Sequence, residues 1–241
     1  MSNFKSIHTM KISVLGTGSV GQALAARLLE LGYEVAMGTR DVAASLARTT
    51  PDNWGNPAIG SWATANPQIK LSTYAEAAAF SDGIIIHAMN GQAAIESLRQ
   101  AGEAKLAGKI LIDITNPLDF SNGFPPSLSV SNTDSLGEQI QAAFPTLKVV
   151  KSLNTMSNPV MVNPATVPGA HTVFMNGNDA EAKETVKLLL KRFGWQDNNI
   201  FDLGDITASR GVEMMLPLWV RVFGKVQMPF FNFHLNMAPR A

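Results

Sequence analysis

Six consecutive residues near the amino terminus form a G-x-G-x-x-G pattern, whose glycines could bring a phosphate close to the backbone. In this pattern the first glycine permits a tight turn, the second lets a pyrophosphate approach, and the third allows close helix packing. A helix beginning there would add free amide groups and a positive dipole. The alternative is a chance glycine cluster. With a strand before it and a helix after it, the pattern predicts dinucleotide binding by Gly16, Thr17, Gly18, Ser19, Val20 and Gly21.

The residues about 20 positions further on predict which dinucleotide binds. Enzymes that use NAD place an acidic residue at the end of the second strand, where it accepts the ribose hydroxyls and would repel a 2′-phosphate. Here Thr39 and Arg40 stand at that position. A hydroxyl and a guanidinium can both donate to phosphate, so they favour NADP(H); the alternative is that Arg40 is a solvated surface charge. Asp41 is interpreted as the N-cap of the next helix.

Acid–base and metal chemistry have few candidates in the chain. There is no cysteine, and the four histidines are scattered without metal-ligand spacing, so no metal site is predicted. His87 ends a strand and is interpreted as structural or solvent-facing, with contact to the nicotinamide as the alternative. Lys151 is interpreted as a surface or packing residue. Hydride transfer between stacked rings needs positioning more than proton carriers, so no catalytic side chain is predicted.

The elements that must position these residues alternate between strand and helix. Buried strand patterns occur at 11–15, 34–37, 84–86, 110–112, 149–150, 172–175 and 200–201. Helical patterns occur at 19–31, 74–80, 91–101, 134–144, 179–193 and 206–222. This alternation predicts an α/β fold, a Rossmann-type doubly wound parallel sheet with a small C-terminal helical extension. We expect a flexible tail at 1–9, an NADP-binding domain at 10–155, and an extension at 156–241 that lines the acceptor site.

Three segments break the alternation. Residues 49–68 are rich in proline and glycine but hold Trp54 and Trp62, so we expect an ordered insertion with both tryptophans buried. Residues 116–132 are rich in Pro, Ser and Asn and follow a strand. An aromatic tail, Phe230-Phe231-Asn232-Phe233, follows the last helix.

Composition limits the partners. Nineteen basic residues balance nineteen acidic ones in 241, which gives no footprint for nucleic acid or an anionic membrane. No apolar stretch approaches the ~20 residues of a membrane helix, and no signal peptide is recognised. We therefore expect a cytoplasmic protein whose partner is a small-molecule hydride acceptor.

Several motifs occur in an order that resembles a known family, the NADP oxidoreductases dependent on the deazaflavin coenzyme F420. The chain is similar also to the reductase domain of the STEAP metalloreductases. The motifs that carry the resemblance are Gly16–Gly21, Gly38–Asp41, Asp113–Pro117, Val149–Thr155, Asn176–Asp179, Asp202–Asp205 and Arg210–Pro217. The insertion and the aromatic tail lie outside the shared pattern. The membrane half of the STEAP proteins is missing, so transmembrane metal reduction is not expected of this chain.

The resemblance implies further site residues. It places Ala88, Met89 and Gln92 along the cofactor, and Asn116, Pro117, Asn154 and Thr155 near the nicotinamide. The acceptor, F420 or a flavin, would lie under the last helix, which carries Arg210 and Met214. The family implies a homodimer, with 214–222 as interface or, alternatively, as core.

Three functions stay open at this point. The first is an NADPH-dependent reductase of a deazaflavin or flavin. The second is a non-catalytic NADP(H) sensor. The third is a reductase of a small imine or carbonyl substrate, which we rank lower because no helix-borne lysine or aspartate suits that chemistry.

Overall fold

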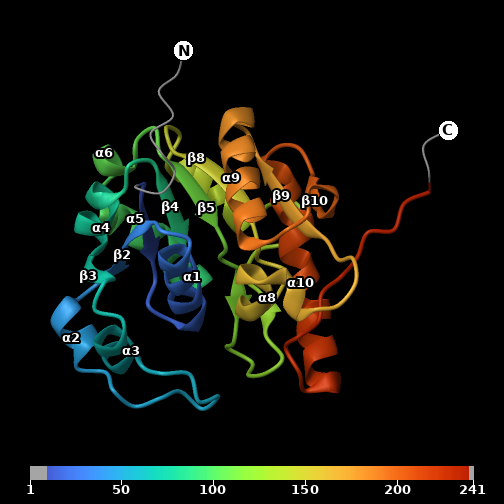
Figure 1. Cartoon of the computed structure of the whole chain (residues 1–241). Helices are drawn as coiled ribbons and strands as arrows, with labels where there is room; N and C mark the ends of the chain where they lie inside the picture. Colours follow the sequence, from blue (N-terminus) through green and yellow to red (C-terminus); the bar gives the residue numbers. More distant parts are fainter. Residues whose placement is uncertain (1–9, 239–241) are drawn as a thin grey trace.

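The structure, a computed structural model, describes residues 10–238 and consists of one eight-stranded sheet covered by helices on both faces (Figure 1). The predicted tail at 1–9 lies outside the described residues. The strands of the sheet are β1 (Lys11–Leu15), β2 (Glu34–Thr39), β3 (Lys70–Thr73), β4 (Ile84–His87), β5 (Ile110–Asp113), β8 (Lys148–Ser152), β9 (Val173–Gly177) and β10 (Ile200–Asp202). A separate antiparallel hairpin is formed by β6 (Leu118–Asp119) and β7 (Ser127–Leu128).

The strand order is β10-β9-β8-β5-β4-β1-β2-β3, and the strands from β3 to β8 all run parallel. The order reverses direction beside β1, which is the topological switch point where such sheets bind ligands. β9 pairs antiparallel with β8, and β10 runs parallel to β9. The predicted α/β parallel sheet is confirmed, with this reversed pair at one edge.

The main helices are α1 (Ser19–Glu30), α2 (Val42–Leu46), α3 (Ile59–Ala65), α4 (Tyr74–Phe80), α5 (Ala94–Ala101), α6 (Glu103–Leu106), α7 (Leu136–Ala143), α8 (Asn158–Val162), α9 (Ala180–Phe193) and α10 (Ser209–Val226). The helices α1, α8 and α9 bury their apolar sides on one face of the sheet, and α4, α5 and α7 on the other. Helices on both faces agree with the doubly wound prediction.

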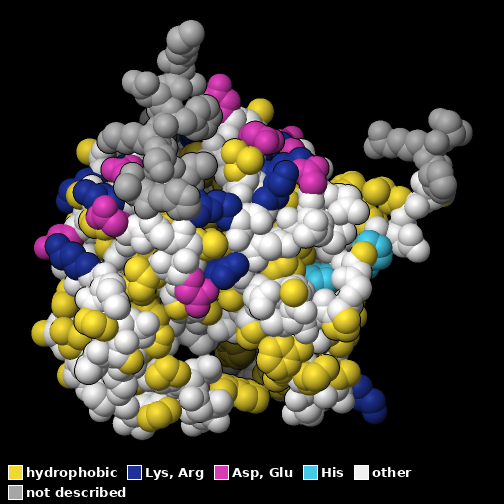
Figure 2. Space-filling model, viewed as in Figure 1, with side chains coloured by type: hydrophobic (Ala, Val, Ile, Leu, Met, Phe, Trp, Pro, Cys, Tyr) yellow, Lys and Arg dark blue, Asp and Glu magenta, His cyan; other side chains and the backbone are white. Residues whose placement is uncertain are grey.

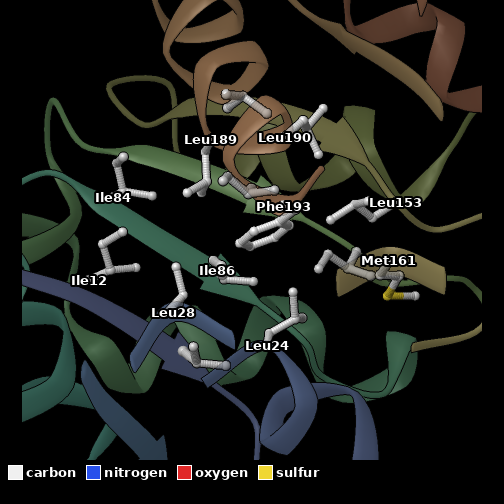
Figure 3. Close-up of a cluster of buried hydrophobic side chains, with 14 of the residues drawn as sticks. Ile12, Leu24, Leu28, Ile84, Ile86, Leu153, Met161, Leu189, Leu190 and Phe193 are labelled. Carbon is white, nitrogen blue, oxygen red and sulfur yellow. The ribbon is translucent and has the colours of Figure 1, made fainter. Parts of the chain in front are cut away.

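Alternating side chains of the central strands build the two cores. Ile84 and Ile86 of β4 pack with Leu24 of α1 and Phe193 of α9, as Figure 3 shows. Ile85 between them points into the opposite core. Full burial of one large aliphatic side chain contributes about 1.5–3 kcal/mol to the free energy of unfolding. A strand segment with apolar residues at consecutive positions is therefore stabilised by packing on both faces of the sheet.

The structure corrects the sequence interpretation in three places. Strand β3 and the hairpin β6–β7 were not predicted, because they are short and largely polar. Trp54 is 74% exposed, so the prediction that both tryptophans are buried is wrong for it, whereas Trp62 packs partly buried against the core. The last helix begins with a 3-10 turn at Ile206–Ala208 and continues as α10 four residues past the predicted end. Among residues 10–238, no helix is both long and apolar enough to cross a membrane.

Candidate functional site

The glycine turn between β1 and α1 has the geometry its pattern predicts. Gly16 adopts a φ of +122°, and a Cβ added there would lie 2.2 Å from the carbonyl oxygen of Ala88. A Cβ on Gly21 would lie 2.2 Å from the carbonyl oxygen of Gly16. A Cβ on Gly18 would meet nothing within 4 Å. Two of the glycines therefore serve backbone packing, and Gly18 keeps open space beside the turn.

The amino end of α1 is available to a ligand. Its N-cap is Gly18, no side chain caps it, and its first turn holds no acidic residue. The free amides and the helix dipole therefore favour an anion here. Gln22 donates from Nε2 to the carbonyl oxygens of Thr17 (3.0 Å) and Pro57 (3.1 Å), which ties the insertion to the glycine turn.

A first cavity of about 360 Å³ lies between the glycine turn and the insertion. Its lining includes Thr17, Gly18 and Ser19 of the glycine turn, and Arg48. Thr39 is buried, and its hydroxyl is 2.6 Å from the hydroxyl of Ser45. Arg40 is exposed and is not among the lining residues. As predicted, the Asp41 carboxylate caps the next helix by accepting from the amide of Ala44 (2.9 Å).

A second cavity of about 220 Å³ lies past the first turn of α1. Of the residues the sequence singled out, five are among its lining residues: Val20, Ala88, Met89, Asn116 and Asn154. Gln92, Pro117 and Thr155 are not among them. The C-terminal helix lines the cavity through Leu216 and Trp219 rather than through Arg210 and Met214. Of the described residues that line this cavity, none carries an ionisable side chain.

Two asparagines join the walls of the second cavity. Asn116 Nδ2 donates to the carbonyl oxygen of Asn154 (2.9 Å), and Asn154 Nδ2 donates to Asn116 Oδ1 (2.9 Å) and to the carbonyl oxygen of Val212 (3.2 Å). A Cβ on Gly91 would lie 2.1 Å from the Asn116 carbonyl oxygen, so the segment after β4 also approaches closely. These contacts hold the loops that follow β4, β5 and β8 in a fixed position relative to one another and to the helix α10.

Behind this cavity lies a buried charge network that the sequence analysis did not find. Lys151 Nζ is 2.8 Å from Asp113 Oδ2 and 2.8 Å from Glu213 Oε1, and it donates to the Thr115 carbonyl oxygen. His87 Nδ1 is 3.3 Å from Asp113 Oδ1. Lys151 and Asp113 are fully buried, so the interpretation of Lys151 as a surface residue is wrong. His87 is fully buried as well, so it is structural rather than solvent-facing.

The network favours the charged forms of Asp113 and Lys151. Burial alone would raise the pKa of the Asp113 carboxyl, but Lys151 and the hydrogen bond from His87 outweigh it and lower the pKa well below its ordinary value. Burial would lower the pKa of Lys151, but Asp113 and Glu213 outweigh it and raise the pKa. Glu213 also accepts from the amides of Leu136 (2.9 Å) and Gly137 (3.0 Å) at the start of α7.

Four members of the network lie one to three residues before a residue that lines the second cavity. Ala88 follows His87, Ile114 follows Asp113, Asn154 follows Lys151 by three positions, and Leu216 follows Glu213 by three. A signal for this network exists in the sequence: Asp113 ends the apolar strand β5 and Lys151 follows the apolar pair Val149-Val150 of β8. The two strands pair these residues in register. Pairing of two charges inside a sheet is visible only once the strand order is known.

Aromatic rings cover the C-terminal side of the site. Trp219 stacks with Phe223 of α10 (centroids 5.4 Å apart) and with Phe231 of the tail (5.2 Å). Trp54 contacts Phe223 edge-on (5.8 Å) from the insertion. Figure 2 shows a hollow bordered by hydrophobic side chains on this side of the molecule. The insertion and the tail, both outside the shared motif pattern, therefore meet on α10.

A parallel sheet with a glycine turn and an uncapped helix at its switch point defines the class of dinucleotide-binding α/β proteins. The sequence profile of the family described as NADP oxidoreductase, coenzyme F420-dependent, matches residues 11–117. A protein from Arthrobacter sp. FB24, named as a candidate F420-dependent NADP-reductase, is 48% identical and superimposes with a TM-score of 0.88 over 95% of this chain and 100% of its own. The chain belongs to the family of F420-dependent NADP oxidoreductases.

More distant relatives are also found. Metalloreductase STEAP3 of Rattus norvegicus is 28% identical over 87% of this chain, and STEAP2 of Homo sapiens is 25% identical over 90%. The chain spans 38% of the length of each of these relatives. An imine reductase from Myxococcus stipitatus in complex with NADP+ is 19% identical, with a TM-score of 0.60 over 90% of this chain and 64% of its own. That likeness concerns the fold alone.

Proposed function

We propose that this protein is an NADPH-dependent oxidoreductase that transfers a hydride between NADP(H) and a flavin-like acceptor, either the deazaflavin F420 or a flavin. The observation that carries the proposal is the pair of cavities on either side of the first turn of α1. Gly18 and Ser19 line one cavity and Val20 lines the other. An elongated ligand with phosphates at its centre and a ring at each end fits this arrangement.

The residues present fit a dinucleotide. The open space beside Gly18 and the uncapped amides of α1 suit the pyrophosphate. Thr17 and Gly21 complete the turn, and Arg40 is a proposed contact for the 2′-phosphate. Thr39 would act through Ser45, because its buried hydroxyl is hydrogen-bonded there.

The second cavity suits the nicotinamide and the acceptor. Asn116 and Asn154 hold the loops in place, and Val20, Ala88 and Met89 form apolar walls that exclude water. Gln92, Pro117 and Thr155 do not line the cavity. We propose that they contact the cofactor from positions next to the lining residues. When bound, the nicotinamide would supply the hydride. The residues around it would bind and orient the two rings, which is the main requirement of a direct transfer.

An activity assay tests this proposal. The purified protein is mixed with NADPH and with F420, FMN or a small cyclic imine, and the loss of NADPH absorbance is followed. We expect turnover with F420 or FMN. Tight NADPH binding without turnover on any acceptor would instead support a redox sensor. Turnover on the imine alone would contradict the flavin-like acceptor.

We also propose that the protein is a homodimer. The helix α10 buries Val212, Leu216 and Val220 in the chain's own structure but leaves Met214 and Leu218 38% and 55% exposed. Exposed apolar side chains on one helix are typical of an interface between subunits. Light scattering coupled to gel filtration measures the mass; a Leu218→Glu variant should shift it to that of a monomer, and an unshifted mass would argue against this interface.

A further inference from the structure

A chain of hydrogen bonds connects the end of β2 to the glycine turn through an arginine that the motif comparison did not single out. Thr39 Oγ1 is 2.6 Å from Ser45 Oγ. Arg48 Nη2 donates to Ser45 Oγ (3.4 Å) and to Thr17 Oγ1 (3.0 Å). The guanidinium of Arg48 therefore contacts the glycine turn, and both line the first cavity beside the amino end of α1, where the phosphates of a dinucleotide would be bound.

The backbone that carries Arg48 is fixed on both sides. Its amide donates to the Ser45 carbonyl oxygen (3.1 Å), and its carbonyl oxygen accepts from the amide of Gly60 in α3 (2.9 Å). A Cβ on Gly60 would lie 2.2 Å from the Leu46 carbonyl oxygen and 2.6 Å from that of Arg48. A glycine is therefore required where α3 packs against this turn. The packing holds Arg48 at one place rather than leaving it on a free loop.

The guanidinium keeps donors for a ligand. Arginine carries five N–H groups, and within the described part of the chain both side-chain hydrogen bonds of Arg48 start from Nη2. Nε and Nη1 therefore remain free to donate single charge-assisted hydrogen bonds to phosphate oxygens. One acidic residue, Asp52, also lines the cavity, but its carboxylate accepts from the amides of Trp54 and Asn56 (2.9 Å each) and from Asn56 Nδ2 (2.9 Å). The Asp52 carboxylate is therefore engaged in hydrogen bonds within its own turn.

Arg40, the arginine of the family motif, differs in its surroundings. Both Arg40 and Arg48 are exposed, but Arg40 does not line the cavity. Both arginines lie near Tyr74: burial raises the pKa of the Tyr74 phenol, and the charges of Arg40 and Arg48 each pull that pKa down. The two guanidiniums therefore face one region, with Arg48 on the side of the cavity.

We propose that Arg48, positioned by Ser45 and Thr17, is the main side chain that recognises the 2′-phosphate of the cofactor, with Arg40 in a lesser role. This inference rests on the proposed NADPH dependence. It assigns cofactor choice to the turn after α2, just before the insertion, as well as to the end of β2. Because Thr39 bonds Ser45, the hydroxyl at the end of β2 acts by holding this arrangement rather than by touching phosphate.

Binding measurements on matched variants test the inference. Wild type, Arg48→Ala, Arg48→Lys and Arg40→Ala are titrated by calorimetry with NADPH and NADH, and with the fragments 2′,5′-ADP and 5′-AMP. We expect Arg48→Ala to weaken NADPH and 2′,5′-ADP by about 10- to 100-fold, the loss of a charge-assisted contact, and to change NADH and 5′-AMP less than about twofold. Arg48→Lys should recover part of the loss, and Arg40→Ala should cost less than Arg48→Ala.

Two results would overturn the assignment. The first is an Arg48→Ala variant that keeps the wild-type ratio of NADPH to NADH affinity. The second is a variant that weakens all four ligands equally, which would mean that Arg48 shapes the glycine turn without reading the phosphate. The wild-type titration tests the proposed function separately: if wild type does not prefer NADPH, the proposed cofactor is wrong whatever the variants do. Thermal unfolding of each variant shows that it is folded.

Discussion

The glycine turn and the buried charge network serve the same site in opposite ways. At the turn, the amides of α1 have no side-chain cap and Gly18 faces open space, so polar groups stay available for a ligand. In the network, Lys151 has three acceptors and Glu213 accepts hydrogen bonds from two backbone amides. The polar groups of the network are therefore paired within the protein. The comparison teaches that binding capacity and rigidity are built from separate residues here. Variants should therefore separate ligand binding from stability.

The largest effect is expected at Lys151. Lys151→Met leaves Asp113 and Glu213 buried without their cation, and breaking a buried pair in this way typically costs about 3–5 kcal/mol. Urea unfolding measures the loss. Lys148→Met is the matched control on the same strand, because Lys148 pairs with Asp179 at the surface (2.8 Å) and its removal should change stability far less. Equal losses in the two variants would contradict a special role for the network.

The network also predicts how stability depends on pH. The folded pKa of Asp113 is lowered, so its contribution is complete above the ordinary carboxyl value, about 3.9, and is lost as pH falls below it. The slope from this one group should approach about 1.4 kcal/mol per pH unit. The contribution of Asp113 is measured as the difference between wild type and Asp113→Asn in how steeply the free energy of unfolding changes with pH at acidic pH. An unchanged slope in that variant would show that Asp113 is not the group responsible.

The raised pKa of Lys151 has the opposite sign. Its contribution is complete below the ordinary lysine value, about 10.4, and is lost as pH rises through the folded value. The contributions of Asp113 and Lys151 to the free energy of unfolding should therefore stay constant from weakly acidic to weakly alkaline pH. Guanidinium unfolding at closely spaced pH values, with Lys151→Met for comparison, measures both limits.

Two glycines of one motif should separate stability from binding. Gly21→Ala places a methyl group 2.2 Å from the Gly16 carbonyl oxygen, and such overpacking costs about 1–3 kcal/mol. Gly18→Ala has room for its methyl group and should keep the melting temperature, but it should weaken NADPH binding by about tenfold or more because the methyl occupies the approach to the backbone. Melting curves and calorimetric titrations measure the two effects. A Gly18→Ala protein with full affinity would move the phosphates away from this turn.

A smaller and more selective effect is expected at Trp219. Its ring lines the second cavity, so Trp219→Leu should raise the KM for the acceptor several-fold and leave the Kd of NADPH nearly unchanged. The exposed Val226 at the end of the same helix, changed to alanine, is the control. If Trp219→Leu weakens NADPH and the acceptor alike, the helix α10 contributes to both sites.

Much of the fold follows from local patterns. The runs at 84–86 and 110–112 are apolar at every position, as is usual for strands covered on both faces, and the run at 11–15 ends in an apolar pair; each was predicted. Strand β3 was not predicted because Lys70-Leu71-Ser72-Thr73 lies at the sheet edge, where burial does not impose a pattern. Nor could the reversal at β9 be predicted, since strand direction depends on the whole connection and not on the strand's residues.

The site was predictable where a motif sets the backbone and less so where tertiary contacts set the side chains. The glycine turn and the asparagines near the second cavity followed from motifs and a resemblance. Arg48 and Lys151 did not, because each acquires its role from residues far away in sequence or from a neighbouring strand. The exposure of Trp54 also could not be inferred, since its partner Phe223 belongs to a helix 169 positions later (223 − 54).

That contact between Trp54 and Phe223 joins the insertion to the helix α10. Asp52 and Asn56, on either side of Trp54, line the first cavity, and Trp219, one helical turn before Phe223, lines the second. If the proposed nucleotide occupies both cavities, separation of these two rings would widen its way out. We therefore expect Trp54→Ala to shorten the residence time of the nucleotide about two- to tenfold in stopped-flow dissociation, since such an aromatic pair is worth about 0.5–1.5 kcal/mol.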